Sequence, residues 1–129
     1  MAQSFRDLKV WNKAIDLTVL VYQFTVDFPK QEVYGLTSQM RRASVSVASN
    51  MAEGSARGTK RDFCQFAKLA RGSNYELQTQ LVISRRLRLG NDDRCEAVET
   101  LSQEVGKMLS GLDEYLTDKI RSHPLTTEN

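Results

Sequence analysis

Apolar residues recur at steps of three and four along four stretches of the chain, which is the spacing of one face of an α-helix. Short segments rich in Pro or Gly separate the stretches, at residues 28–35, 54–58 and near 90. The pattern predicts four helices, which cover about residues 5–27, 36–53, 60–89 and 91–121.

Short connections between long helices favour antiparallel neighbours. We therefore expect an all-α fold, an antiparallel up-down-up-down four-helix bundle formed by residues 1–121 as one domain. Residues 122–129, which include His123 and Pro124, are expected to form a frayed C-terminal tail.

Local signals support these boundaries. Thr59, followed three residues later by Asp62, is typical of a helix N-terminus, and Asn91 begins a second group of good capping residues. Gly54 stands where a helix often ends in a left-handed residue. Gly72 falls inside the third helix, where Gly costs up to about 1 kcal/mol relative to Ala, so we expect close backbone packing or a bend there.

The first helix carries two apolar stripes side by side. The first stripe comprises Leu8, Trp11, Ile15, Thr18 and Tyr22, and the second comprises Ala14, Leu17, Val21, Phe24 and Phe28. A helix of a monomeric bundle usually needs only one such face. We therefore expect a homo-oligomer.

The composition is that of a globular protein, with 40% hydrophobic and 26% charged residues among 129. Cys64 and Cys95 are too few for a disulfide framework, and the polar start has no apolar signal core. The longest apolar run, residues 17–24, is too short to cross a bilayer. We expect a soluble cytoplasmic protein with reduced thiols and no membrane association.

The net charge of +2 conceals a strong asymmetry along the chain. Residues 41–90 hold ten basic and three acidic side chains, whereas residues 91–129 hold four basic and nine acidic ones. Such a distribution indicates either an anionic partner for the middle of the chain or attraction between the two parts.

Small and polar residues mark the second and third helices. Polar residues along one edge of each helix predict a structural polar network. Its members are Arg42, Ser46, Asn50, Glu53, Ser73 and Glu76. Within it we expect Arg42 and Glu76 to form a buried ion pair. The alternative is a ligand-binding or catalytic role for these acids, hydroxyls and the cation.

The sequence offers little else for catalysis. No His or Cys lies among the network residues to activate a nucleophile, and no Gly-rich phosphate loop is present. The single histidine, His123, falls in the tail, and the two cysteines lack metal-ligand spacing. We expect neither enzymatic activity nor a metal or cofactor.

A row of cations follows the outer side of the third helix and the linker before it. This basic stripe comprises Arg57, Lys60, Arg61, Lys68, Arg71, Arg85 and Arg86. A solvated charged face is one interpretation, but the excess of Arg favours phosphate contacts. Tyr75 is the only clear stacking candidate nearby, so RNA or DNA would be bound through the backbone with little sequence preference.

The order of several short motifs resembles a known family. The motifs are Phe5-Arg-Asp-Leu8 with Trp11, Phe28-Pro29, Tyr34-Gly35-Leu36, Arg41-Arg-Ala43, Asn50-Met-Ala-Glu-Gly54 and Gly72-Ser-Asn-Tyr-Glu76. Over about residues 5–120 the chain resembles the bacterial four-helix-bundle proteins encoded in intervening sequences of large-subunit ribosomal RNA genes. Relatives of that family include the accessory variability determinant of diversity-generating retroelements.

The resemblance implies a four-helix bundle that assembles into a barrel-like homopentamer. For the retroelement relatives it further implies a basic surface that binds nucleic acid and a partner reverse transcriptase. Many members of the family have no established function, and the acidic last third of this chain departs from a uniformly basic surface.

Three functions follow as hypotheses. The first is a non-enzymatic, oligomeric accessory protein that binds nucleic acid through the basic stripe. The second is a structural or protein-interaction scaffold, whose basic stripe is occupied by an acidic partner or by the acidic fourth helix of a neighbouring subunit. The third is an enzyme that acts through Glu53 or Glu76.

Overall fold

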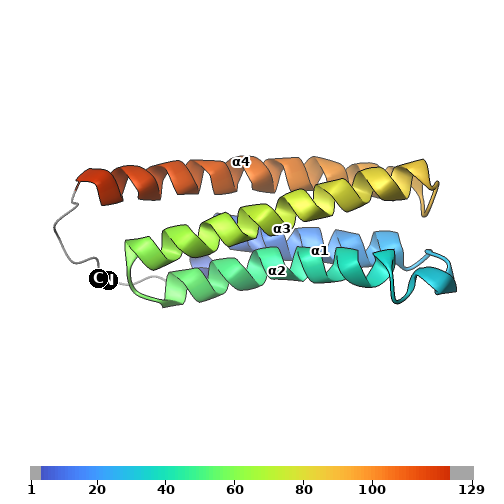
Figure 1. Cartoon of the computed structure of the whole chain (residues 1–129), viewed down its shortest axis with the longest axis horizontal. Helices are drawn as coiled ribbons and strands as arrows, with labels where there is room; N and C mark the ends of the chain where they lie inside the picture. The colour runs from blue at the N-terminus through green and yellow to red at the C-terminus, as the bar shows by residue number, and fades with distance from the viewer. Residues whose placement is uncertain (1–3, 123–129) are drawn as a thin grey trace.

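A computed structural model describes residues 4–122 of the chain, and this part is entirely helical (Figure 1). Four long helices form the bundle, and two short 3-10 helices precede and link the first two. The elements are η1 (Phe5–Asp7), α1 (Lys9–Thr25), η2 (Lys30–Glu32), α2 (Leu36–Ala56), α3 (Lys60–Arg86) and α4 (Asp92–Ser122). The prediction of an all-α four-helix bundle is confirmed.

The helices follow one another around the bundle. Each long helix packs against its predecessor and successor in the chain, and α4 closes the bundle against α1. Among the described residues no Cα atoms of α1 and α3 lie within 8 Å of each other, so these two helices lie on a diagonal. Their outer faces therefore point in opposite directions.

Two of the predicted helix starts are confirmed in atomic detail. The hydroxyl of Thr59 accepts a hydrogen bond of 3.1 Å from the backbone N–H of Asp62. The side-chain oxygen of Asn91 accepts one of 3.0 Å from the N–H of Arg94. Both bonds satisfy donors that a helix N-terminus leaves without an intrahelical partner.

The expected role of Gly54 is wrong. The second helix continues past it to Ala56, and Gly54 is buried where α2 meets α3. A Cβ atom at Gly54 would lie only 2.5 Å from the Cβ atom of Phe66. The glycine is needed for close packing of the two helices, and it does not end α2.

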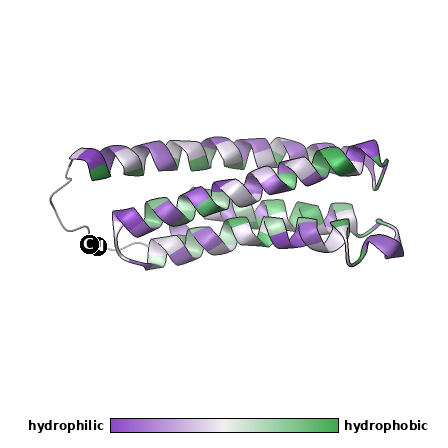
Figure 2. Ribbon diagram, in the orientation of Figure 1, coloured by the Kyte–Doolittle hydropathy of each residue, from purple (hydrophilic) through white to green (hydrophobic). Residues whose placement is uncertain are grey.

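The core is formed by one of the two stripes of α1. Ala14, Leu17, Val21 and Phe24 are fully buried, whereas Ile15 and Tyr22 of the other stripe are exposed. Hydrophobic positions accordingly recur along each helix between hydrophilic ones (Figure 2). Within residues 4–122, no helix is both long and apolar enough to span a membrane.

The predicted tail falls almost wholly outside the described residues. Ser122 ends α4, and His123 with the residues that follow it lies beyond the part of the chain described here.

Candidate functional site

A small polar cluster joins α2 to α3 at the edge of their interface. The hydroxyls of Ser46 and Ser73 lie 2.8 Å apart, one on each helix. Asn50, one turn after Ser46, donates its side-chain N–H to the Ser46 carbonyl at 2.8 Å and to the Ser46 hydroxyl at 3.0 Å. These three residues of the predicted polar network do lie together.

The predicted buried ion pair is wrong for the single chain. Arg42 and Glu76 are both exposed, and no ion pair joins them within residues 4–122. Small residues such as Ala43 and Ala70 fill the buried side of the interface between α2 and α3. The longer side chains at the edge of this interface reach water. Glu53 also leaves the network, because it forms an ion pair of 3.1 Å with Arg57, the residue that follows α2.

Much of the basic stripe is paired with acids of the same chain. The ammonium of Lys68 and the guanidinium of Arg71 both bind the carboxylate of Asp113 in α4, at 2.8 and 2.6 Å. Further along, Arg85 reaches Glu99 of α4 at 3.4 Å. The attraction between the basic middle and the acidic end of the sequence thus holds α3 and α4 together.

Other cations of the stripe face solvent. Arg61 and Arg86 are exposed, and neither forms an ion pair among the described residues. Lys60 is exposed in the first turn of α3, and Arg57 in the linker stacks over the ring of Phe66, 4.8 Å from its centroid.

The exposed cations are not evenly spread along α3. One group covers residues 57–71 at the start of the helix, and the other covers residues 85–88 at its end. Arg71 and Arg85 are 14 positions apart, which is about 21 Å at 1.5 Å per residue, and no residue between them is basic. The basic stripe is therefore two clusters, separated by a middle in which Glu76 is the one charged residue.

Asp113 is the most strongly engaged acid of the described chain. The residue is 8% exposed, and besides the two cations its carboxylate accepts hydrogen bonds from Cys64 at 3.4 Å and Thr117 at 3.3 Å. Burial alone would raise the pKa of Asp113, but the hydrogen bonds from Lys68 and Cys64 and the charges of Lys68 and Arg71 outweigh it and lower the pKa. The same hydrogen bond raises the pKa of Lys68. The acid is therefore ionised in the folded chain.

A second buried polar cluster joins α3 to α4, and the sequence analysis missed it. Asn74, 1% exposed, donates to the Ser102 carbonyl at 2.9 Å and accepts from the Ser102 hydroxyl at 2.8 Å. Gln78 adds a hydrogen bond of 3.1 Å to the same hydroxyl. The signal was available, because Asn74 and Ser102 each stand four residues after one buried apolar residue and three before another.

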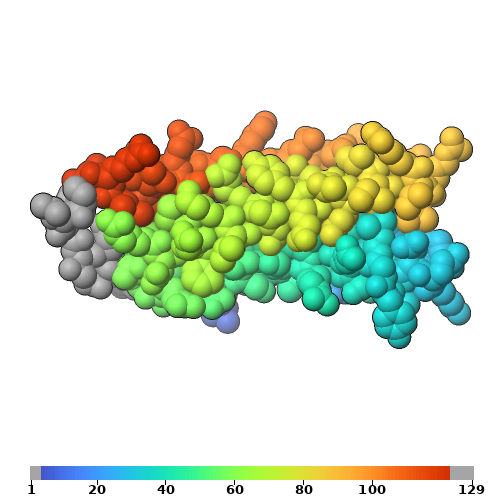
Figure 3. Space-filling model, in the orientation of Figure 1, coloured from blue at the N-terminus to red at the C-terminus, as the bar shows by residue number. Residues whose placement is uncertain are grey.

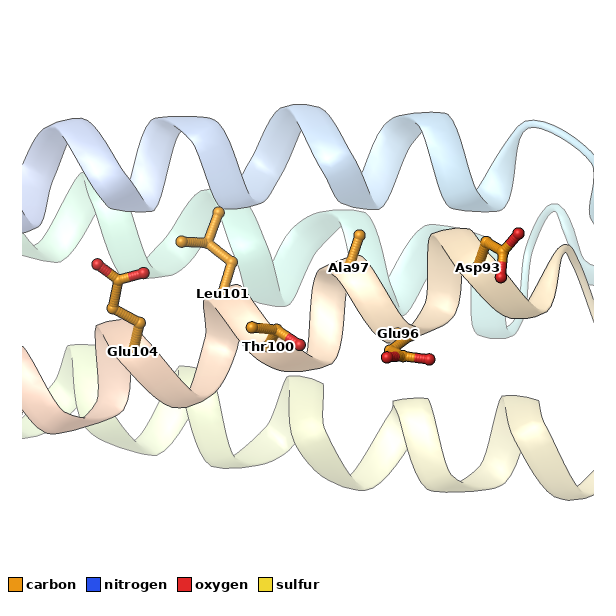
Figure 4. A pocket seen from close by; sticks show the side chains of 6 residues that line it. All are labelled: Asp93, Glu96, Ala97, Thr100, Leu101 and Glu104. Atoms are coloured by element: carbon orange, nitrogen blue, oxygen red, sulfur yellow. The ribbon is translucent and has the colours of Figure 1, made fainter.

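A shallow hollow runs along α4 and faces α1 (Figure 4). Ala97 and Leu101 point towards α1, and acids rim the hollow. Its lining residues are Asp93, Glu96, Ala97, Thr100, Leu101 and Glu104. The lining holds carboxylates and one hydroxyl but no His or Cys, and Lys13 of α1 binds Glu104 at 3.2 Å. No described residues group into a set of three or more metal ligands.

Comparison with known proteins agrees with this fold. The family model of the 23S rRNA-intervening sequence proteins matches residues 6–111, so the chain belongs to this family. The crystal structure of a protein of unknown function from the S23 ribosomal protein family of Bacteroides thetaiotaomicron is similar in fold. The two chains are 21% identical with a TM-score of 0.72, over 81% of this chain and 97% of that one. No functionally curated protein matches the sequence.

Proposed function

We propose that the protein is a non-enzymatic, homo-oligomeric bundle that binds nucleic acid through phosphate contacts of α3. The observation that carries this proposal is the pair of exposed cations Arg61 and Arg86, which no acid of the described chain neutralises. Lys68 and Arg71 add to it, since together they carry two positive charges against the one negative charge of Asp113.

Arginine suits this role because its planar guanidinium binds phosphate oxygens through two parallel hydrogen bonds. No aromatic side chain except Tyr75 is exposed near these cations on α3, so stacking with bases contributes little. Binding would therefore be electrostatic and weakly dependent on sequence. A reverse transcriptase as a further partner is implied only by the resemblance to the retroelement accessory proteins and stays a prediction.

Self-association is the second part of the proposal. The exposed apolar residues Ile15, Val19 and Tyr22 of α1 support it, because surface apolar residues aligned along a helix are typical of an interface. The family resemblance makes five subunits the specific prediction. Light scattering at micromolar concentration should give about five times 14.6 kDa. A monomer would refute self-association, whereas a dimer or tetramer would refute only the number.

A protein-interaction scaffold is the alternative function. The ion pairs from Lys68, Arg71 and Arg85 to α4 favour it, because acids of the same chain already reduce the positive charge of the stripe. In this case α3 would present too little positive charge for nucleic acid, and the assembled surface would serve other proteins.

A binding titration separates the two functions. The intact oligomer is titrated with a mixed-sequence DNA duplex and with a structured RNA at 50 mM and at 200 mM salt. The proposal predicts binding at the lower salt concentration and a large loss of affinity at the higher one, because released counterions drive phosphate binding. If neither nucleic acid binds at low salt, the nucleic-acid role is wrong and the scaffold takes its place.

A further inference from the structure

An open groove of about 630 Å³ follows the outer side of α2 from its first turn. Tyr22 of α1 and Val33, which directly follows η2, border the groove. Arg41 and Arg42 line it together with four hydroxyl-bearing side chains of α2, and no acid of the described chain does. In Figure 3 the first turns of α2 (cyan) lie at the surface at one end of the bundle, and the first turns of α3 (green) lie at the other end. The groove is therefore separate from the cations at the start of α3.

Arg41 is held in one orientation although no acid binds it. Its Nε–H donates a hydrogen bond of 2.9 Å to the hydroxyl of Thr25, and that hydroxyl donates to the Val21 carbonyl at 2.8 Å. The guanidinium also lies over the ring of Tyr22, 4.4 Å from its centroid. Its other N–H groups donate to no residue in the part of the chain that the structure describes. Because fixing an arginine side chain costs conformational entropy, these free donors are oriented in advance for a ligand.

Arg42 brings a second positive charge to the groove. It is exposed and forms no ion pair within residues 4–122, and the same holds for the ion pairs of Arg41. The first turn of α2 adds the positive end of a helix dipole, where Glu32 accepts from the N–H of Leu36 at 3.3 Å. Glu32 does not line the groove, so its negative charge leaves the two arginines without a partner there.

Thr37 contributes a buried hydroxyl that lacks a hydrogen bond. The residue is 6% exposed, and its Oγ1 atom has no partner among the described residues. A buried hydroxyl without a partner costs free energy. Thr37 lines the groove one helical turn before Arg41, so an oxygen atom of an anion bound to Arg41 is the acceptor that this hydroxyl lacks.

We infer that this groove binds the dianionic group of a phosphate monoester. Arginine binds phosphate oxygens through paired hydrogen bonds, and a phosphate monoester carries about −1.5 to −2 charges at neutral pH, which two arginines balance. A carboxylate would balance only one of them. The ring of Tyr22 and the exposed Val33 and Val45 provide apolar walls for the organic part of the ester. The inference depends neither on self-association nor on nucleic-acid binding by α3.

Calorimetric titration with phenyl phosphate at about pH 8, where this ester is a dianion, tests the inference. Phenyl sulfate has the same shape and one charge less, so it should bind about tenfold more weakly or worse. Arg41→Ala and Arg42→Ala should each weaken the binding of phenyl phosphate by about tenfold or more, because each removes hydrogen bonds to a charged group. Lys107→Ala removes an exposed cation of α4 as the control and should leave the affinity unchanged.

Thr37→Val separates a role in binding from a role in folding. The substitution removes a hydroxyl that has no partner, so the unfolding temperature without ligand should not fall. The affinity for phenyl phosphate should fall, because the ester loses a donor. An unchanged affinity would show that the hydroxyl does not face the bound anion, and this would contradict the site.

Oligonucleotides with and without a terminal phosphate identify the source of the ester. Displacement of phenyl phosphate by the phosphorylated form alone indicates a nucleic-acid end, and displacement by neither form indicates a small molecule. Displacement by both would refute a site for a monoester.

The inference is also wrong if phenyl phosphate does not bind, if phenyl sulfate binds equally well, or if both arginine variants bind like the unmodified protein. Suppose that phenyl phosphate does not bind and that the arginine variants change the mass measured by light scattering. A second copy of the chain then fills the groove, and the site for an ester is refuted.

Discussion

Arg71 of α3 donates a hydrogen bond of 2.6 Å to the carboxylate of Asp113 in α4, 42 residues further along the chain. The contact is largely buried on the acid side, and the side chain of Arg71 is 30% exposed. Lys68, one turn earlier, binds the other carboxylate oxygen. One acid therefore fixes two cations and the position of α4 relative to α3.

Replacing Asp113 should destabilise the fold. In Asp113→Asn, Lys68 and Arg71 lose the shared negative charge, and one of the two acceptor oxygens becomes an NH2 group. We expect a loss of about 1–3 kcal/mol in the free energy of unfolding, since hydrogen bonds to charged groups contribute about this much. Urea unfolding followed by circular dichroism measures the effect. Glu114→Gln removes a neighbouring exposed carboxylate as a control, and an equal loss there would show that the contacts of Asp113 are not the cause.

The carboxylate of Asp113 should also make the free energy of unfolding depend on pH. Its pKa is lowered in the folded chain, while in the unfolded chain it titrates near the ordinary value of 3.8. Its contribution is therefore complete above the unfolded pKa and is lost as the pH falls through the folded one. Between pH 5 and pH 2 the unmodified protein should lose more unfolding free energy than Asp113→Asn. Parallel curves for the two proteins would contradict the lowered pKa.

The sequence predicted the helices well, because apolar periodicity and capping residues are local signals. The predicted second and fourth helices differ from α2 and α4 by no more than three residues at any end. The predicted helix end at Gly54 was wrong, because a glycine after an apolar stretch can mark either the end of a helix or a close approach to another helix. Only the position of Phe66 in space distinguishes them.

Side-chain partners across helices were harder to predict. Arg42 and Glu76 fall on facing edges of their helices, but the spacing along a helix does not tell how far a long side chain extends into water. Asp113 stands four residues after the buried Leu109 and three before the buried Leu116. An acid at such a position requires cations nearby, and this signal would have indicated the site from the sequence.

Two glycine substitutions should act in opposite directions. Gly54→Ala places a methyl group 2.5 Å from the Cβ of Phe66, so it should lower the unfolding temperature despite the better helix propensity of Ala. Gly72→Ala meets no atom within 4 Å and should raise the stability of the isolated chain by up to about 1 kcal/mol. Thermal unfolding of the two variants beside the unmodified protein compares them. Stabilisation by Gly54→Ala would contradict the tight packing of α2 on α3.

The buried cluster of Asn74 and Ser102 should also contribute to stability. Ser102→Ala leaves the Asn74 side-chain oxygen without its donor, and an unsatisfied buried polar group costs about 1–3 kcal/mol. Ser49→Ala, at an exposed position of α2, is the matched control and should change the free energy of unfolding by less than about 0.5 kcal/mol. Equal effects of the two substitutions would show that the cluster adds nothing.

Nucleic-acid binding by α3 is the central claim, and charge reversal at its two unpaired arginines tests it most directly. Lys68 is left unchanged, because a Glu in its place would lie beside Asp113 and disturb the fold. Arg61→Glu with Arg86→Glu is compared with Lys30→Glu with Lys107→Glu, which changes the net charge equally at exposed sites away from α3.

The measurement is the slope of log affinity against log salt concentration for a mixed-sequence duplex. The account predicts that the Arg61 and Arg86 variant binds more weakly, with a slope smaller by about one to two for each subunit in contact, while the control keeps most of its affinity and slope. Equal losses in the two variants would contradict a binding surface on α3.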